Sequence, residues 1–235
     1  MKRALLHTIK EAVCFLLFPP SCPACGRAIG KNEIFCPACS KTIERPDREK
    51  LCPRCGKEKC LCGELDPAFS HVYPTAFYLG SIVPAIHNLK FNHQPGHAKT
   101  LAPLLLTTLR QYYPQNEHDL LAAAPISKKR LRKRGYNQAA LLAKELSHLC
   151  EIPFAPDALI KTRETKAQHD LSAKDRRTNL ADSFQASPIV AGKRVLLIDD
   201  VFTTGSTANE AAKTLLAAGA EKVDVLVLAS THDHT

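Results

Sequence analysis

The feature that most constrains the fold is an apolar run that ends in two acids and continues into a hydroxyl-rich turn. Residues 195–207 read VLLIDDVFTTGST, and alanine-rich residues at helical spacing follow as far as Gly219. A nearly continuous apolar run is typical of a central parallel strand covered on both faces. Helices often end at a residue with a left-handed backbone conformation, which glycine adopts easily. The stretch therefore predicts a buried strand, a tight turn and a helix ending at Gly219.

The rest of residues 67–235 also alternates apolar strands with amphipathic helices. Residues 71–80 indicate an early strand, and Pro74 places it at an edge of the sheet because proline cannot donate a ladder hydrogen bond. The alternation predicts an α/β fold, a parallel sheet flanked by helices. Further strands are expected at 119–124, 158–163 and 223–230, and further helices at 97–112 and 137–149.

The turn at 203–207 has the composition of an anion site. Backbone N–H groups at a helix N-terminus have no partners within the helix and point outward, and hydroxyl groups lie beside them here. Gly205 allows close approach of the backbone. Next to a bound phosphate, the carboxylates of Asp199 and Asp200 could accept hydrogen bonds from ribose hydroxyls. They could instead bind a hydrated magnesium ion that the substrate also holds. The alternative is an ordinary strand-to-helix turn capped by Ser and Thr.

Ten cysteines are spread unevenly, and eight of them lie between Cys22 and Cys62. The spacing Cys22-x2-Cys25-x10-Cys36-x2-Cys39 forms two knuckles, which aim four sulfurs at one metal and predict a closed tetrahedral zinc site. Because most of the chain lacks cysteine, this clustering favours metal binding in a reducing compartment over a secreted disulfide scaffold.

The second set, Cys52-x2-Cys55-x4-Cys60-x-Cys62, has a last pair separated by one residue instead of two. We expect a second structural zinc site that follows the first along the chain. A degenerate site assisted by His71, or an exchange of pairs between the two sets, stays open. One or two zinc ions would supply the folding energy of this module, since it holds few apolar residues.

Residues 1–20 carry apolar residues on one helical face and predict an amphipathic helix closed by Pro19 and Pro20. The run is too short and too polar to span a membrane. We expect it to pack on its own domain or on a partner, with association at a membrane surface as the alternative. The formal net charge of +9 favours anionic partners such as nucleic acid or phosphorylated molecules.

Two polar segments separate the expected strands. Six of the seven residues 128–134 are Lys or Arg, which indicates an anion-facing loop or, alternatively, a solvated face. Tyr136 is the only aromatic residue beside this run, so no stacking platform for single strands is evident from the residues alone. Residues 161–184 have mixed charge and indicate a flexible lid, with a helix over 172–181 capped by Ser172.

Four ordered motifs resemble known families. The string at 195–207 resembles, position for position, the phosphoribosyl pyrophosphate (PRPP) signature of type I phosphoribosyltransferases. With the cysteine module, RGYNQ at 134–138 and TKAQHDLSAKDRRTN at 165–179, the chain resembles the ComF family, which includes ComFC and GntX-type proteins. The resemblance implies a type I phosphoribosyltransferase-like domain behind a double zinc ribbon. The expected zones are a helix at 1–20, a zinc-ribbon module at 21–66 and the phosphoribosyltransferase-like domain at 67–235.

The resemblance also implies roles for individual residues. It implies that Asp199 and Asp200 are the catalytic residues and contact the ribose hydroxyls of PRPP. It also implies that PRPP binds together with magnesium. It implies PRPP binding by Asp199, Asp200, Val201, Thr203, Thr204, Gly205, Ser206 and Thr207. It implies an anion loop, for pyrophosphate, of Pro125, Lys128, Lys129, Arg130, Arg134, Asn137 and Gln138, and lid residues Gln168, Arg176 and Asn179.

Members of the ComF family are linked to the uptake and handling of transforming DNA. The resemblance therefore implies a cytoplasmic competence protein, with a peripheral place at the inner membrane as an option. Its expected partners are a phosphoribosyl ligand, single-stranded DNA and proteins of the DNA-uptake machinery that dock on the zinc module. The alternatives are a metabolic phosphoribosyltransferase and a zinc-ribbon scaffold with a vestigial pocket. The intact acids and the TTGST turn argue against a vestigial pocket.

Overall fold

The computed structural model describes residues 20–60, 62–92, 94–115, 117–162 and 183–231. The amphipathic helix expected over residues 1–20 lies outside them, apart from its last residue. The helix expected over 172–181 also lies outside them, as do the lid residues Gln168, Arg176 and Asn179.

Four parallel strands form the central sheet in the order β1 (Val72–Phe77), β6 (Lys222–Ser230), β5 (Arg194–Phe202) and β2 (Leu120–Ala123). Strand β5 pairs with β6 on one side and with β2 on the other, so the VLLIDD run is central as predicted. Strand β1 lies at the edge, where Pro74 costs no ladder hydrogen bond on the outer side.

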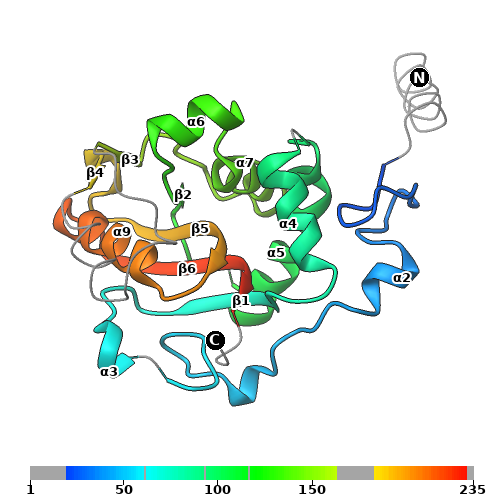
Figure 1. Ribbon diagram of the computed structural model, residues 1–235. Helices are drawn as coiled ribbons and strands as arrows, with labels where there is room; N and C mark the ends of the chain where they lie inside the picture. The colour runs from blue at the N-terminus through cyan, green and yellow to red at the C-terminus, as the bar shows by residue number, and fades with distance from the viewer. Residues whose placement is uncertain (1–19, 61, 93, 116, 163–182, 232–235) are drawn as a thin grey trace, which may run out of the picture.

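Helices cover both faces of this sheet, as its apolar strands require. Leu196 and Ile198 of β5 pack into the core formed with α4 (Ile82–Phe91), α5 (His97–Tyr112) and α7 (Gln138–Cys150). Val195 and Leu197 point to the opposite face and pack against α9 (Ser206–Ala217). Figure 1 shows α9 on one side of the sheet and α4, α5 and α7 on the other.

Helix α9 ends where the sequence predicts. Gly219 has φ +93°, and its N–H donates to Leu216 O at 2.9 Å. Ala220 N donates to Leu215 O at 3.1 Å, so these two bonds satisfy carbonyls of the last turn.

Two of the expected elements differ from the structure. The strand expected at 158–163 is β3 (Leu159–Lys161), but it pairs antiparallel with β4 (Phe184–Ala186) in a separate two-stranded sheet. The short helix η3 (Pro188–Val190) follows. The expected basic loop contains the helix α6 (Lys128–Arg134). Ser127 Oγ accepts from Arg130 N at 3.3 Å at its start, and Gly135 (φ +83°) ends it.

The cysteine-rich residues precede β1 and contain little regular structure. Their elements are the single-turn helices α2 (Pro37–Ser40), η1 (Arg48–Lys50) and α3 (Cys62–Leu65). This segment runs along α4 and below β1 to α3, so it contacts the α/β domain at several places (Figure 1).

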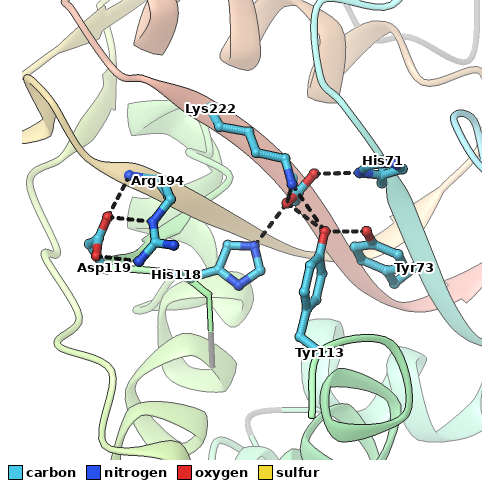
Figure 2. Close-up of polar contacts among 8 residues, drawn as sticks. His71, Tyr73, Tyr113, His118, Asp119, Arg194 and Lys222 are labelled. Atoms are coloured by element: carbon cyan, nitrogen blue, oxygen red, sulfur yellow. Dashed lines mark hydrogen bonds and ion pairs between the residues drawn. The ribbon is translucent and has the colours of Figure 1, made fainter. Parts of the chain in front are cut away.

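A buried polar cluster lies at the amino ends of the strands, away from the DDVFTTGST turn. The Asp224 carboxylate of β6 contacts His71, Tyr113, His118 and Lys222. Figure 2 labels these four partners. His71 Nδ1 lies 3.0 Å from Asp224 Oδ1, so His71 pairs with Asp224 and is not part of the second cysteine set.

Candidate functional site

Two carboxylates stand side by side near the carboxyl end of β5. Asp199 Oδ1 accepts from Asp200 N at 2.8 Å, and Asp200 Oδ1 accepts from Val201 N at 2.9 Å. Asp200 is 4% exposed, while Asp199 keeps part of its surface open. Burial and the neighbouring Asp200 carboxylate raise the pKa of Asp199 well above its usual range. Hydroxyl or cationic groups of a ligand would stabilise the ionised pair.

Lys90, at the end of α4, faces this pair. Its ammonium nitrogen lies 2.5 Å from Asp200 Oδ2, and both side chains are largely buried. Among the described residues, none gives Asp200 Oδ2 a hydrogen bond of good geometry, so the contact is an ion pair held by charge. Lys90 was not among the residues predicted for the site, because a single Lys in an apolar helix carries no motif.

The turn after β5, where the sequence predicts an anion site, leads directly into helix α9. Gly205 has φ +74° and directly precedes α9, whose helical residues begin at Ser206. A Cβ at position 205 would lie 2.7 Å from Leu65 Cδ2 and 2.7 Å from Phe202 Cζ, so only glycine fits. Thr204 Oγ1 and Ser206 Oγ lie 3.0 Å apart on the same turn. Backbone N–H groups and hydroxyls thus gather at one helix N-terminus.

Arg134 connects the basic helix to the carboxylate pair. Lys128, Lys129 and Arg130 are exposed on α6, whereas Arg134 is half-buried, and its Nη1 donates to Gln138 Oε1 at 2.8 Å. Burial lowers the pKa of Arg134, and the charge of Asp200 opposes that shift. The charge of Arg134, at the carboxyl end of α6, therefore lies close enough to Asp200 for the two to interact electrostatically.

The other residues expected in the anion loop lie between β2 and α7. Pro125 follows β2 directly after Ala124. Asn137 Nδ2 donates to Ala124 O at 2.9 Å, and Asn137 Oδ1 accepts from Ala139 N at 3.0 Å, which caps α7. Gln138 is 4% exposed. Asn137 thus joins the two ends of the loop, and Gln138 accepts a hydrogen bond from Arg134.

An exposed aromatic ring lies beside the basic helix, which was not expected from the sequence. Phe91 is 47% exposed, and the Arg134 guanidinium lies 4.8 Å from its ring centroid. His87 lies 4.5 Å from the same ring. Tyr136, the aromatic residue next to the run in sequence, instead donates its hydroxyl to Leu89 O at 2.7 Å. Tertiary contact, and not sequence proximity, brings Phe91 to the basic helix.

The first cysteine set forms one cluster, of Cys22, Cys25, Cys36 and Cys39. Zn–S bonds of about 2.3 Å in a tetrahedron place sulfurs about 3.8 Å apart, and Cys25 Sγ and Cys36 Sγ lie 3.7 Å apart. Burial opposes the shift, but backbone N–H groups of Cys36, Cys25 and Ala24 lower the pKa of Cys22 to about 7. The geometry of the four sulfurs fits zinc.

The second set forms its own cluster, of Cys52, Cys55, Cys60 and Cys62, so the two sets do not exchange pairs. Cys52 Sγ and Cys62 Sγ lie 3.9 Å apart, which fits a tetrahedral zinc site despite the one-residue spacing of the last pair. Burial again opposes the shift, but backbone N–H groups of Cys55 and Arg54 lower the pKa of Cys52 to about 7. All eight cysteines therefore fit two structural zinc sites.

Comparison with known proteins agrees with both parts. The family model of the phosphoribosyl transferase domain matches residues 131–235, and that of the double zinc ribbon domain matches residues 13–68. DNA utilization protein YhgH of Escherichia coli (strain K12) is 33% identical over 213 residues, covering 89% of this chain and 90% of that protein. Competence protein F of Haemophilus influenzae is 34% identical over 214 residues, covering 86% and 92%.

Solved structures with a similar fold include the glutamine PRPP amidotransferase of B. subtilis. It is 22% identical with a TM-score of 0.38, and the match covers 57% of this chain and 26% of that one. A similarity this low adds nothing to the assignment of the site. Among the helices that the structure describes, none combines the length and the apolar character needed to cross a bilayer.

Proposed function

Because the chain belongs to the ComF family, which joins a double zinc ribbon to a phosphoribosyl transferase domain, we propose that it handles incoming single-stranded DNA in natural transformation. In this proposal the end of β5 binds PRPP or a related phosphoribosyl ligand. The observation that carries the proposal is the carboxylate pair Asp199–Asp200 directly before the Gly205 turn, with Lys90 on Asp200. One ligand that carries both a ribose and a phosphate matches these two adjacent groups.

The ligand would be divided between the two groups. Asp199 and Asp200 would hold the ribose hydroxyls, with magnesium bound partly by the ligand's own phosphates. The backbone N–H groups and hydroxyls of 203–207 would hold the 5-phosphate. The segment from Pro125 to Arg130 would face the pyrophosphate, since it follows the neighbouring strand β2 at the same edge of the sheet.

The DNA surface of this proposal is helix α6 together with Phe91. Lys128, Lys129 and Arg130 are exposed and can neutralise phosphates in a sequence-independent way. Phe91 supplies the π-face that sequence-tolerant binding of single strands uses. The names of the relatives, DNA utilization protein and competence protein F, are consistent with such a surface. Because thiolate clusters persist in reducing compartments, the proposal places the protein in the cytoplasm, with a peripheral position at the inner membrane as an option.

A second candidate is a metabolic phosphoribosyltransferase. The observation in its favour is the same carboxylate pair, because pentosyl transfer needs groups that position the ribose and stabilise its developing positive charge. DNA handling accounts in addition for the basic helix beside an exposed aromatic ring.

The test is binding of PRPP with magnesium and of a single-stranded oligonucleotide, each measured alone and then in the presence of the other. The proposal expects both ligands to bind the full zinc-loaded chain. Competition would place the strand at the end of β5 or at the neighbouring start of α6, and independence would place it on a surface elsewhere. A chain that binds PRPP but no single strand would favour the metabolic enzyme. A chain that binds neither would refute both candidates.

A further inference from the structure

The module of the second cysteine cluster packs against the turn at 203–207. We call this turn the phosphate turn, because the proposed function places the ligand's phosphate there. Helix α3 begins at Cys62 and ends at Leu65, whose side chain is only 6% exposed. Leu65 Cδ2 lies 2.7 Å from the point where a Cβ on Gly205 would stand. Leu65 therefore closes the back of the turn and leaves it no room to move in that direction.

A buried amide continues this contact into α9. Asn209 is 6% exposed, and its Nδ2 donates to Leu65 O at 3.0 Å and to Asp66 O at 3.3 Å. Its Oδ1 accepts from Ala68 N at 2.7 Å. Asn209 N also donates to Gly205 O at 2.8 Å, which closes the first turn of α9. One residue thus joins the end of the zinc ribbon to the start of the anion-binding helix.

The other knuckle of the same cluster is anchored beside the turn. Lys57 follows Cys55 by two residues and is 4% exposed. Its ammonium group donates to the backbone oxygen of Thr231 and, at 2.9 Å, to Thr231 Oγ1. The same nitrogen lies 6.0 Å from the ring of Phe202, the last residue of β5. The Cys52–Cys55 knuckle therefore contacts the residue after β6 and lies near the end of β5, from which the turn emerges.

Metal binding would connect the contacts of Leu65, Asn209 and Lys57 into one structural unit that holds the phosphate turn. We call this unit the support. Helix α3 has four residues, too few to be stable as an isolated helix. The Sγ atoms of Cys52 and Cys62 lie 3.9 Å apart, so zinc at this cluster would tie the start of α3 to the anchored knuckle. We infer that the second zinc ribbon positions the phosphate turn at Gly205 through Leu65 and Asn209. Leu65 and Asn209 are positioning residues, and the effect on ligand affinity rests on the proposed function.

Hydrogen–deuterium exchange of the full zinc-loaded chain tests the support without any ligand. Leu65→Ala should speed exchange of the amides at 209–212, the first hydrogen-bonded amides of α9, and Leu65→Met, which keeps the volume, should restore the slow rate. Arg48→Ala is the matched control, because Arg48 joins the same module to Gln111 O at 2.9 Å on another side of the domain. Unchanged exchange at 209–212 in Leu65→Ala would overturn the inference.

Titration with PRPP and magnesium then tests the consequence. Leu65→Ala should weaken binding by roughly 5- to 150-fold, the usual range of coupling between two sites, while it keeps about two zinc ions per chain. If Leu65→Ala loses zinc or unfolds, Asn209→Leu replaces it, because it keeps a similar volume without charge and removes the hydrogen bonds to Leu65 O, Asp66 O and Ala68 N. Wild-type affinity in the folded variant would contradict the inference. A wild-type chain without PRPP binding would defeat the proposed function, and the exchange result would still decide the support.

Discussion

The ammonium nitrogen of Lys90 lies 2.5 Å from Oδ2 of Asp200 and joins the end of α4 to the end of β5. The Lys90 side chain is 19% exposed and that of Asp200 is 6% exposed, so the pair is mostly removed from water. A buried carboxylate next to a second one costs free energy unless a cation lies close. Lys90 supplies that cation and favours the ionised form of Asp199, the form that a ribose or magnesium ion requires, against burial and the Asp200 charge.

Replacing Lys90 by Met should shift the pH dependence of PRPP binding. Lys90 lowers the pKa of Asp199, so its removal raises that pKa further and protonates the carboxyl at a higher pH. If PRPP binding needs the ionised carboxylates, then lowering the pH should abolish binding by Lys90→Met at a higher pH than binding by the wild type. Calorimetric titrations over a pH series measure the midpoint. Lys90→Arg keeps the charge and serves as the control, and an unchanged midpoint in Lys90→Met would refute the role of Lys90.

Replacing the first basic residues of α6 should weaken single-strand binding through electrostatics. Lys128, Lys129 and Arg130 changed together to Gln should flatten the plot of log affinity against log salt, by about 0.7 for each phosphate that the variant no longer neutralises. The control changes Lys99, Lys144 and Lys213, which are exposed on other helices, and removes the same net charge. Equal slopes for the two triple variants, measured by fluorescence anisotropy, would exclude α6 as the strand-binding element.

Phe91 should contribute through the bases and not through the phosphates. Phe91→Ala should lose about 1–3 kcal/mol for a base that stacks on the ring, while affinity for an abasic strand of equal length stays the same. Phe91→Tyr keeps a stacking face, and Ile189→Ala removes an apolar side chain that is 54% exposed elsewhere. Equal losses for the abasic and the normal strand would show that Phe91 acts by holding Arg134 and not by stacking.

The Asp224 cluster should control stability at acid pH. Although burial opposes it, contacts with His118, Lys222 and Tyr113 lower the pKa of Asp224 below its ordinary value of 3.8. The stability contributed by this ionised group is therefore complete above about pH 4 and is lost as the pH falls from there toward the folded-state pKa. Asp224→Asn should lose roughly 3–5 kcal/mol at neutral pH, because it leaves buried partners of the carboxylate uncompensated.

Chemical denaturation of both chains over pH 3–7, a range about the ordinary carboxyl pKa, checks this. The variant should show a weaker fall in stability below pH 4. Asp119→Asn is a matched control, since Asp119 pairs with Arg194 at 2.9 Å near the same end of the sheet but stays partly exposed. A variant as stable as the wild type would show that the cluster adds nothing to stability.

Much of the fold could be predicted because its signals are local. The apolar run of β5, the helix α9 and its end at Gly219 each follow from residues close in sequence. The pairing of β3 could not be predicted, because its partner β4 lies across a long polar segment. Helix α6 was missed because six charges hide any apolar period, although Ser127 and Gly135 are cap signals that could have revealed it.

The candidate site also contains residues that the sequence could identify and residues that it could not. Asp199, Asp200 and Gly205 are contiguous in sequence, and the structure keeps them in one strand and turn. Lys90 and Phe91 reach the site only because α4 packs over the sheet, so no spacing rule could identify them. Leu65 is similar, since its contact with Gly205 depends on how the zinc ribbon folds onto the domain.

The proposed phosphoribosyl site at the end of β5 is tested by calorimetric titration of the zinc-loaded chain with PRPP and magnesium. The comparison is the double variant Asp199→Asn and Asp200→Asn. The substitutions keep the shape of both side chains and remove only their charge. We predict that the wild-type chain binds and that the double variant, folded and with its zinc retained, shows no heat of binding. Equal titration curves for the two chains, or no binding by the wild type, would contradict a phosphoribosyl pocket at this place.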